Sequence, residues 1–135
     1  DPIPSRGLGD VYKRQEMGDI SRSVKAIAKE IDVPVVALSQ LNRASESRTT
    51  KRPVMADLRD SGALEQDADL ILFPFRPEVY EKTPETAGLA EIIVAKHRNG
   101  ETGKRKLHFA ARCAKFEDLA LDDPALTRPD DDWDE

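Results

Sequence analysis

The chain has 135 residues, of which 39% are hydrophobic and 35% are charged, and its formal net charge is −5 at pH 7. This length suits one domain with its own core, and the charge content places much of the chain at a surface or in a tail. The single cysteine, Cys113, excludes an internal disulfide and favours a reducing compartment. No apolar run has the length of a membrane span and no signal-peptide pattern opens the chain, so we expect a cytoplasmic protein without membrane contact.

The charge is distributed unevenly along the chain. Residues 122–135 hold seven acidic residues and one arginine, a charge of −6, so residues 1–121 carry about +1. Seven lysines and arginines lie between Ile93 and Lys115, where Glu101 is the only acidic residue. We therefore expect an anion-binding patch on a nearly neutral body, with a plain solvated hairpin as the alternative, and a disordered acidic tail over residues 121–135.

The N-terminal part of the chain predicts one helix followed by one strand. Residues 1–15 carry proline and glycine signals without a clear period, and we expect them to be irregular. From Glu16 to Asp32, apolar residues recur at steps of three and four, which predicts an amphipathic helix with its apolar stripe in the core. The stripe consists of Met17, Ile20, Val24, Ile27, Ala28 and Ile31. Pro34 ends the helix, and the apolar run VVALSQ (35–40) predicts a strand.

A long polar stretch separates this strand from the next apolar run. Residues 41–54 are polar and basic and lack core residues, so they predict a loop. The following stretch, ADLRDSGALEQDAD (56–69), predicts short helical turns around Gly62.

Three further apolar runs predict strands. LILFPF (70–75) predicts a buried strand, although Pro74 is unfavourable in a central one. Residues 90–96 and 106–109 predict two strands joined by a turn. Strands separated by helices or long loops indicate an α/β fold, with a mainly parallel sheet and an antiparallel edge hairpin.

Two of the predicted strands end in polar residues of a particular kind. The first ends in Ser39 and Gln40, and the run 90–96 ends in Lys96, followed by His97 and Arg98. In open α/β sheets, ligands lie beyond the carboxyl ends of the strands. A neutral amide suits hydrogen bonding to a water or a phosphate oxygen, and two cations suit the negative charge that develops in phosphoryl transfer. The alternative is that these side chains are simply solvated.

Three stretches of the sequence resemble the DnaB-type replicative DNA helicases. They are EMGDISRSVKAIAKEIDVPVVALSQLNR, DLRDSGALEQDADLILFPFR and EIIVAKHRNGETG, in the family's order, and the resemblance runs from about Arg14 to about Leu119. It implies the later half of a RecA-like motor domain, which is a partial P-loop ATPase core. RecA-like recombinases and clock ATPases share that core, but they would not be expected to carry DLRDSGALEQDAD.

The resemblance implies a function and a set of partners. Members of the family form a homo-hexameric ring of RecA-like domains around single-stranded DNA and unwind duplex DNA, with ATP and Mg²⁺ bound between neighbouring subunits. Gln40 would sense the γ-phosphate and couple hydrolysis to the DNA loops. Lys96 and Arg98 would reach into the neighbouring subunit's ATP site, with Arg98 as the arginine finger. Primase and a helicase loader are further partners that the family implies.

The resemblance also implies a DNA-binding loop at Asp57–Gly62, facing the central channel. Arg59, Asp60 and Gly62 would contact the DNA backbone there. Asp60 stands where the family usually has Glu, and Glu101 stands where it often has Pro, which puts the rigidity of that turn in doubt.

Two motifs of the family are missing from the sequence. The phosphate-binding pattern G-x-x-x-x-G-K-[ST] does not occur, and residues 1–13 hold no apolar run able to form the Walker B strand. We therefore expect a truncated or chimeric chain, with the helicase segment at residues 14–120 and unrelated sequence at residues 1–13; a divergent linker is the alternative. The alternative function is a non-catalytic DNA-binding or ring-interface fragment.

Other constellations of reactive residues are weaker. His97, His108 and Cys113 match no common zinc-ligand spacing and lack a fourth ligand. Ser39 lacks the flanking glycines of a nucleophile elbow, so a serine triad with His97 is disfavoured.

Overall fold

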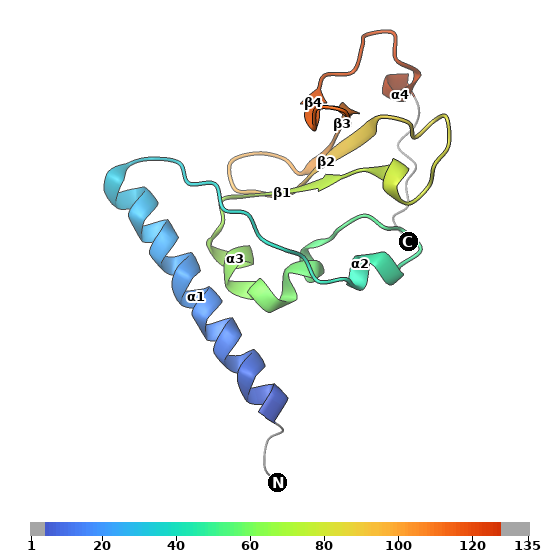
Figure 1. The fold of residues 1–135 in the computed structure, drawn as a ribbon. Helices are drawn as coiled ribbons and strands as arrows, with labels where there is room; N and C mark the ends of the chain where they lie inside the picture. Colours follow the sequence, from blue (N-terminus) through green and yellow to red (C-terminus); the bar gives the residue numbers. More distant parts are fainter. Residues whose placement is uncertain (1–4, 128–135) are drawn as a thin grey trace.

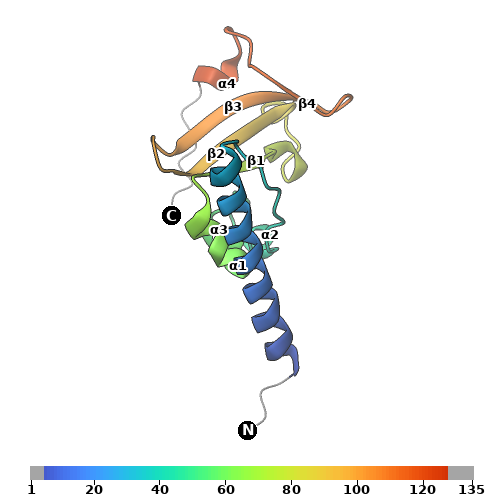
Figure 2. The same ribbon diagram turned by 90° about the vertical axis from the view of Figure 1, so that its left-hand side faces the viewer.

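The structure is a computed structural model that describes residues 5–127 (Figure 1). Its elements in chain order are α1 (Ser5–Ile31), α2 (Ala44–Ser47), the 3-10 helix η1 (Met55–Ser61), α3 (Gly62–Asp67), β1 (Leu70–Phe75), the 3-10 helix η2 (Pro77–Val79), β2 (Leu89–His97), β3 (Gly103–Ala110), β4 (Lys115–Glu117) and α4 (Pro124–Thr127). The helices α1, α2 and α3 lie together on one side of a four-stranded sheet (Figures 1 and 2).

All strand pairs of this sheet are antiparallel, and the strand order is β1-β2-β3-β4. The prediction of a mainly parallel sheet is therefore wrong for the part of the chain that the structure describes. The predicted antiparallel edge hairpin is confirmed, since β2 and β3 pair antiparallel. Parallel neighbours need a crossover connection, usually an α-helix, whereas the connection between β1 and β2 holds only the short helix η2. Between β2 and β3 the chain makes only a short turn, which permits nothing but a hairpin.

Strand β1 lies at the edge of the sheet and has one buried face. Ile71, Phe73 and Phe75 point inward, while Leu70 and Leu72 stay exposed. The expectation of a fully buried strand is thus half right, and the edge position explains why Pro74 is tolerated. The core forms where this inward face meets the loop and helix residues beneath it. It consists of Leu58, Ile71 and Phe73, with Leu41, Met55, Ala68, Ile93 and Ala95 packed against it.

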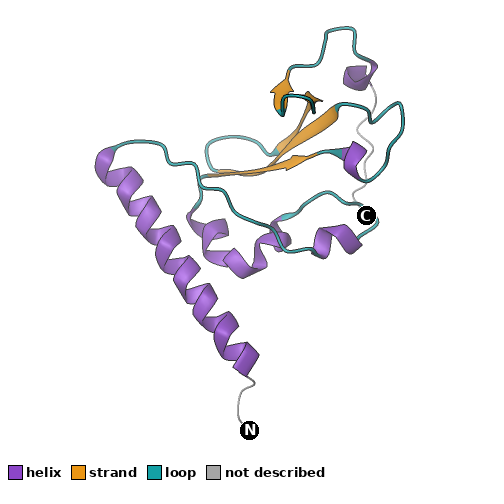
Figure 3. Ribbon diagram, in the orientation of Figure 1, coloured by secondary structure: helices purple, strands orange, loops and turns teal. Residues whose placement is uncertain are grey.

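The predicted strand 35–40 does not form a strand. These residues run as part of the extended connection between α1 and α2, drawn as a continuous loop in Figure 3. Val36 is 88% exposed and Leu38 is 98% exposed, so the apolar run is uncovered within the described chain. An apolar β-branched run becomes a strand only where a neighbouring strand completes its hydrogen bonds, and no described strand lies in register with it.

Helix α1 begins earlier than the sequence predicts. The prediction of a helix over residues 16–32 is confirmed to Ile31. The prediction of irregular backbone over residues 1–15 is wrong from residue 5 onward, because α1 starts at Ser5. Pro4 directly precedes the helix, and no proline lies between Pro4 and Pro34. Extending an existing helix costs little per residue compared with nucleating one, so the glycines of this segment do not stop it.

The face that α1 buries differs from its predicted apolar stripe. Gly18 and Ser21 face α3, and a Cβ atom at Gly18 would lie 3.7 Å from the Cβ of Ala63. The Ser21 hydroxyl donates to Asp67 Oδ2 at 2.7 Å. Small residues let the two helices approach closely and meet through a polar contact. Within the described residues Ile20, Ile27 and Ile31 remain about half exposed, so their predicted place in the core is wrong here.

The start of the predicted acidic tail has local structure. The Asp123 side chain accepts a hydrogen bond from the Ala125 N–H at 2.8 Å and so begins α4, and Ala125 is buried. Disorder is therefore wrong for residues 124–127, while residues 128–135 lie outside the described chain.

Two substitutions test the different roles of the first two apolar runs. Leu38→Ala should change the free energy of unfolding by less than about 0.5 kcal/mol, because the side chain is 98% exposed. Ile71→Ala should cost about 2–5 kcal/mol, because the side chain is 8% exposed in the core. Urea denaturation of the two variants, with the unsubstituted chain beside them, measures both. A large loss for Leu38→Ala would show that residues 35–40 pack within this chain.

Candidate functional site

Lys96 and Arg98 lie at the end of β2 and reach the same short helix. The Lys96 ammonium donates to the carbonyl oxygens of Glu65 at 2.7 Å and Gln66 at 3.2 Å. Nη2 of Arg98 donates to the Gln66 carbonyl at 2.8 Å. Both cations therefore neutralise the carboxyl end of α3, where a helix exposes unpaired carbonyls and partial negative charge.

A β-bulge between β1 and β2 changes the direction of β2 near its end. Ile71 pairs with Lys96 but Leu72 pairs with Val94, so Ala95 has no partner of its own on β1. A bulged residue bends the strand and re-aims the side chains beyond it. Residues two apart on a strand also point to the same side, which is why Lys96 and Arg98 can share α3.

Asp69 provides the carboxylate for this cluster. Nη1 of Arg98 donates to Asp69 Oδ1 at 2.8 Å, and the Lys25 ammonium donates to both carboxylate oxygens at 2.7 and 2.6 Å. The hydrogen bond from Lys25 is the main reason that the pKa of Asp69 lies below its ordinary value, and the charge of Arg98 adds to it. Arg98 remains 46% exposed at its side chain, so it is still accessible to a further anion.

Gln40 comes from a different segment of the chain. It ends the extended, unpaired connection after α1 and is exposed. Within the described residues no hydrogen bond joins it to Lys96 or Arg98, so the structure brings together two of the three residues predicted to bind nucleotide. The next residue, Leu41, packs against the core and fixes where the connection re-enters the fold.

The predicted DNA loop is built on a buried ion pair. Asp57, 1% exposed at its side chain, accepts two hydrogen bonds from the Arg48 guanidinium at 2.8 Å each. Its Oδ2 also accepts the Val54 N–H at 2.8 Å, at the start of η1. The hydrogen bonds from Arg48 are the largest reason that the pKa of Asp57 lies below its ordinary value, and burial opposes them. The base of the loop is therefore held by an ion pair with Arg48 and by a hydrogen bond from the Val54 backbone N–H.

The loop itself lies in η1, which continues directly into α3. The side chains of Arg59, Asp60 and Ser61 lie outside what the structure describes, and their predicted roles stay predictions. Gly62 is exposed, has helical backbone angles (φ −56°, ψ −27°) and has no atom within 4 Å of where a Cβ would stand. Nothing within the described chain therefore requires glycine at this position.

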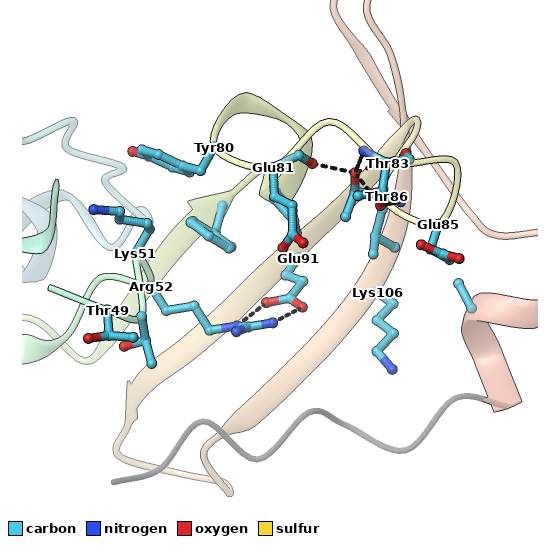
Figure 4. A pocket seen from close by; sticks show the side chains of 15 residues that line it. Thr49, Lys51, Arg52, Tyr80, Glu81, Thr83, Glu85, Thr86, Glu91 and Lys106 are labelled. Carbon is cyan, nitrogen blue, oxygen red and sulfur yellow. Dashed lines mark hydrogen bonds and ion pairs between the residues drawn. The ribbon is translucent and has the colours of Figure 1, made fainter.

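A shallow cavity of about 490 Å³ lies at the other end of the sheet (Figure 4). The buried Glu91 accepts two hydrogen bonds of 2.8 Å from Arg52 there. The Phe75 and Tyr80 rings stack with centroids 5.7 Å apart. None of the predicted site residues lines this cavity. The sequence signal that could have revealed the Arg52–Glu91 pair is the lone carboxylate inside the apolar run AEIIVA.

The strand register excludes a shared metal ion at the two histidines. His108 pairs with Leu89 at the start of β2, while His97 ends that strand. Eight residues of strand separate these positions, roughly 26 Å. No cluster of potential metal ligands occurs among the described residues.

Comparison with known proteins identifies the family. The sequence model of the DnaB-like helicase C-terminal domain matches residues 6–118. The chain belongs to this family. The replicative DNA helicase DnaB of Pasteurella multocida (strain Pm70) is 56% identical over 105 residues, which are 78% of this chain and 22% of that protein. DnaB of Geobacillus stearothermophilus is 47% identical over 117 residues, which are 87% of this chain and 26% of that protein.

A solved structure supports the same assignment. A DnaB-like replicative helicase, described with its interactions with primase, matches with a TM-score of 0.76 and 46% identity over 79% of this chain and 26% of that chain. The fold is thus part of a RecA-like helicase domain. The chain spans about a quarter of the length of the curated DnaB relatives that it matches. None of the described helices combines the length and apolarity needed to cross a membrane.

The Arg48–Asp57 pair of this DnaB-like domain makes stability depend on pH. A carboxyl group with a lowered pKa stabilises the fold above its ordinary pKa, near 3.8, and this contribution is lost as the pH falls through the native value. Asp57→Asn should lower the free energy of unfolding by about 1–3 kcal/mol at pH 7. The gap between variant and unsubstituted chain should narrow below about pH 4.

Asp19→Asn is the matched control for this measurement. Asp19 pairs with Arg22 on the surface of α1, with side chains 75% and 67% exposed, so its loss should cost less than about 0.5 kcal/mol. Urea unfolding across pH 3–8 gives both values. Equal effects of the two substitutions would contradict a structural role for the buried pair.

Proposed function

We propose that the chain is part of an ATP-dependent replicative DNA helicase that unwinds duplex DNA by translocating along single-stranded DNA as a hexameric ring. Within that ring the segment supplies the in-trans cations, Lys96 and Arg98, and the DNA loop at Asp57–Gly62. One observation carries the proposal: both cations bind the carboxyl end of α3, and the amino end of α3 is the last residue of the loop. The proposed reaction, ATP-driven unwinding of DNA, is inferred from membership of the DnaB-like helicase family.

The residues of this segment fit a nucleotide's phosphates better than its metal ion. Arg98 offers a planar fork and Lys96 a point charge, and both suit phosphate oxygens. The described residues contain no cluster of carboxylates that could hold Mg²⁺. In the proposed function Mg²⁺ and most contacts to ATP belong to other parts of the parent domain, and Gln40 contributes a neutral amide at the γ-phosphate.

The proposed DNA contacts carry no sequence preference. Arg59, Asp60 and Gly62 would meet the sugar-phosphate backbone, and phosphate contacts position a protein without reading bases. A motor that moves along any sequence needs this property. The further proposed partners are identical subunits in the ring, primase and a helicase loader, and the proposed location is the cytoplasm.

A chimera provides the setting in which these roles can be measured. Residues 14–118 of this chain replace the corresponding segment of Geobacillus stearothermophilus DnaB, with which the chain is 47% identical over 117 residues. Absence of any DNA-stimulated ATPase in a folded, hexameric chimera would favour the non-catalytic DNA-binding or ring-interface alternative.

Arg59→Ala in the chimera should weaken binding of single-stranded DNA equally across sequences. Because one phosphate contact is lost, the slope of log affinity against log salt should flatten by about 0.7. Fluorescence anisotropy with two unrelated oligonucleotides over a salt series measures this. Arg22→Ala, at an exposed position on α1, is the control and should leave the slope unchanged. A changed base preference with an unchanged slope would contradict the backbone role.

Arg98→Ala in the chimera should lower ATPase turnover by on the order of 10³-fold while leaving nucleotide binding largely intact, because the side chain acts on the neighbouring subunit's site. Arg98→Lys should restore little, since an ammonium group cannot reproduce the fork. Rings that mix Arg98→Ala subunits with subunits lacking the P-loop lysine should regain ATPase, because some interfaces then carry neither defect. Mixed rings without recovery would leave the in-trans role unsupported.

A further inference from the structure

Asp69 lies in the short connection between α3 and β1, and Arg98 contacts it twice. The Arg98 backbone N–H donates to the Asp69 carbonyl at 3.0 Å. Nη1 of the Arg98 side chain donates to Asp69 Oδ1 at 2.8 Å. Asp69 therefore holds both the backbone and the guanidinium group of Arg98.

Gln66 completes the geometry of the guanidinium. Its carbonyl accepts Nη2 of Arg98 at 2.8 Å, so the two terminal nitrogens have separate acceptors about one turn apart on the chain. Two hydrogen bonds from one planar group fix its plane as well as its position. A guanidinium has five N–H donors, so three remain for another anion.

Lys25 makes this arrangement more than a surface ion pair. An isolated pair between Asp69 and Arg98, with side chains 61% and 46% exposed, would hold its geometry weakly. The Lys25 ammonium, from α1, binds both oxygens of Asp69, and its side chain is only 24% exposed. The carboxylate of Asp69 is thus held by α1 as well as by Arg98.

We propose that Asp69, held by Lys25, is the residue that positions the arginine finger Arg98 for the neighbouring subunit's phosphate. The inference rests on the proposed function, since it needs Arg98 to act across a subunit interface. Asp69 itself touches no nucleotide in this arrangement. Its effect passes through Arg98, and a misplacement of a catalytic group by about 1 Å can cost on the order of 10²-fold in rate.

The first test measures steady-state kinetics of the chimera described above, with single-stranded DNA present. Asp69→Ala should lower kcat by about 10- to 100-fold and leave the KM for ATP within about twofold, because substrate binding does not depend on the finger. Asp69→Asn, which keeps an acceptor oxygen for Arg98, should retain more activity than Asp69→Ala. Asp19→Ala, which removes an exposed ion pair on α1, is the matched control and should leave kcat and KM unchanged.

The second test asks on which subunit's site Asp69 acts. Subunits carrying Asp69→Ala should regain ATPase when mixed with subunits lacking the P-loop lysine, and should regain none when mixed with Arg98→Ala subunits. A merely structural defect in Asp69→Ala would instead lower activity at the ATP site of the same subunit. Such subunits would then regain ATPase when mixed with Arg98→Ala subunits. Recovery in the second mixture, or none in the first although mixed rings form, overturns the proposal.

Failure of the proposed function and failure of the positioning role give different results. If Arg98→Ala keeps its turnover, the proposed in-trans function fails and the role of Asp69 fails with it. If Arg98→Ala is inactive and sorts in trans while Asp69→Ala has unchanged kcat, the proposed function stands and only the positioning role is overturned.

Discussion

The short helix α3 and its contacts with Lys96 and Arg98 are the constraint on which the rest of the site depends. Its amino end continues the loop proposed to meet DNA, and its carboxyl end accepts hydrogen bonds from Lys96 in β2 and from Arg98 just after it. α1 packs against the same helix through Gly18 and Ser21. Six residues of helix therefore join a proposed DNA contact to a proposed nucleotide contact within one subunit. A helix this short is stable only through such tertiary contacts.

The base of the loop that we propose to contact DNA is held by several hydrogen bonds to Asp57. Asp57 is buried, yet both of its oxygens are satisfied by Arg48 and by the Val54 N–H. Burying a charge without partners would be strongly unfavourable, whereas a fully hydrogen-bonded carboxylate can specify one local geometry. The open space at Gly62 shows that packing within the described chain does not limit the last residue of the loop. The described constraint on the loop is therefore concentrated at Asp57, at its base.

Much of the local structure could be predicted from the sequence, and its assembly could not. The helix over residues 16–31 and the three apolar runs from residue 70 onward follow from periodicity, and all four are present. Periodicity says which residues share a face but not what covers that face. Ile27 and Leu38 fit a buried pattern, yet both stay exposed because no described element packs on them. The prediction of a mainly parallel sheet was wrong because strand direction depends on the connections between strands, which the apolar pattern of a single run does not show. Lys96 and Arg98 were predicted together, but their shared partner α3 lies some 30 residues away in sequence, which no local pattern reveals.

The distribution of donors at this site explains why arginine, and not lysine, occupies position 98. Lys96 has three N–H donors and uses two of them on the carbonyls of Glu65 and Gln66, which leaves one. A lysine at position 98 that replaced both side-chain contacts of Arg98 would likewise keep one donor, and it would have no plane to orient it. Arg98 makes the same number of intrachain contacts and keeps three donors in a fixed fork. The side chain can therefore be anchored to its own subunit and still present a bidentate surface to an anion on another.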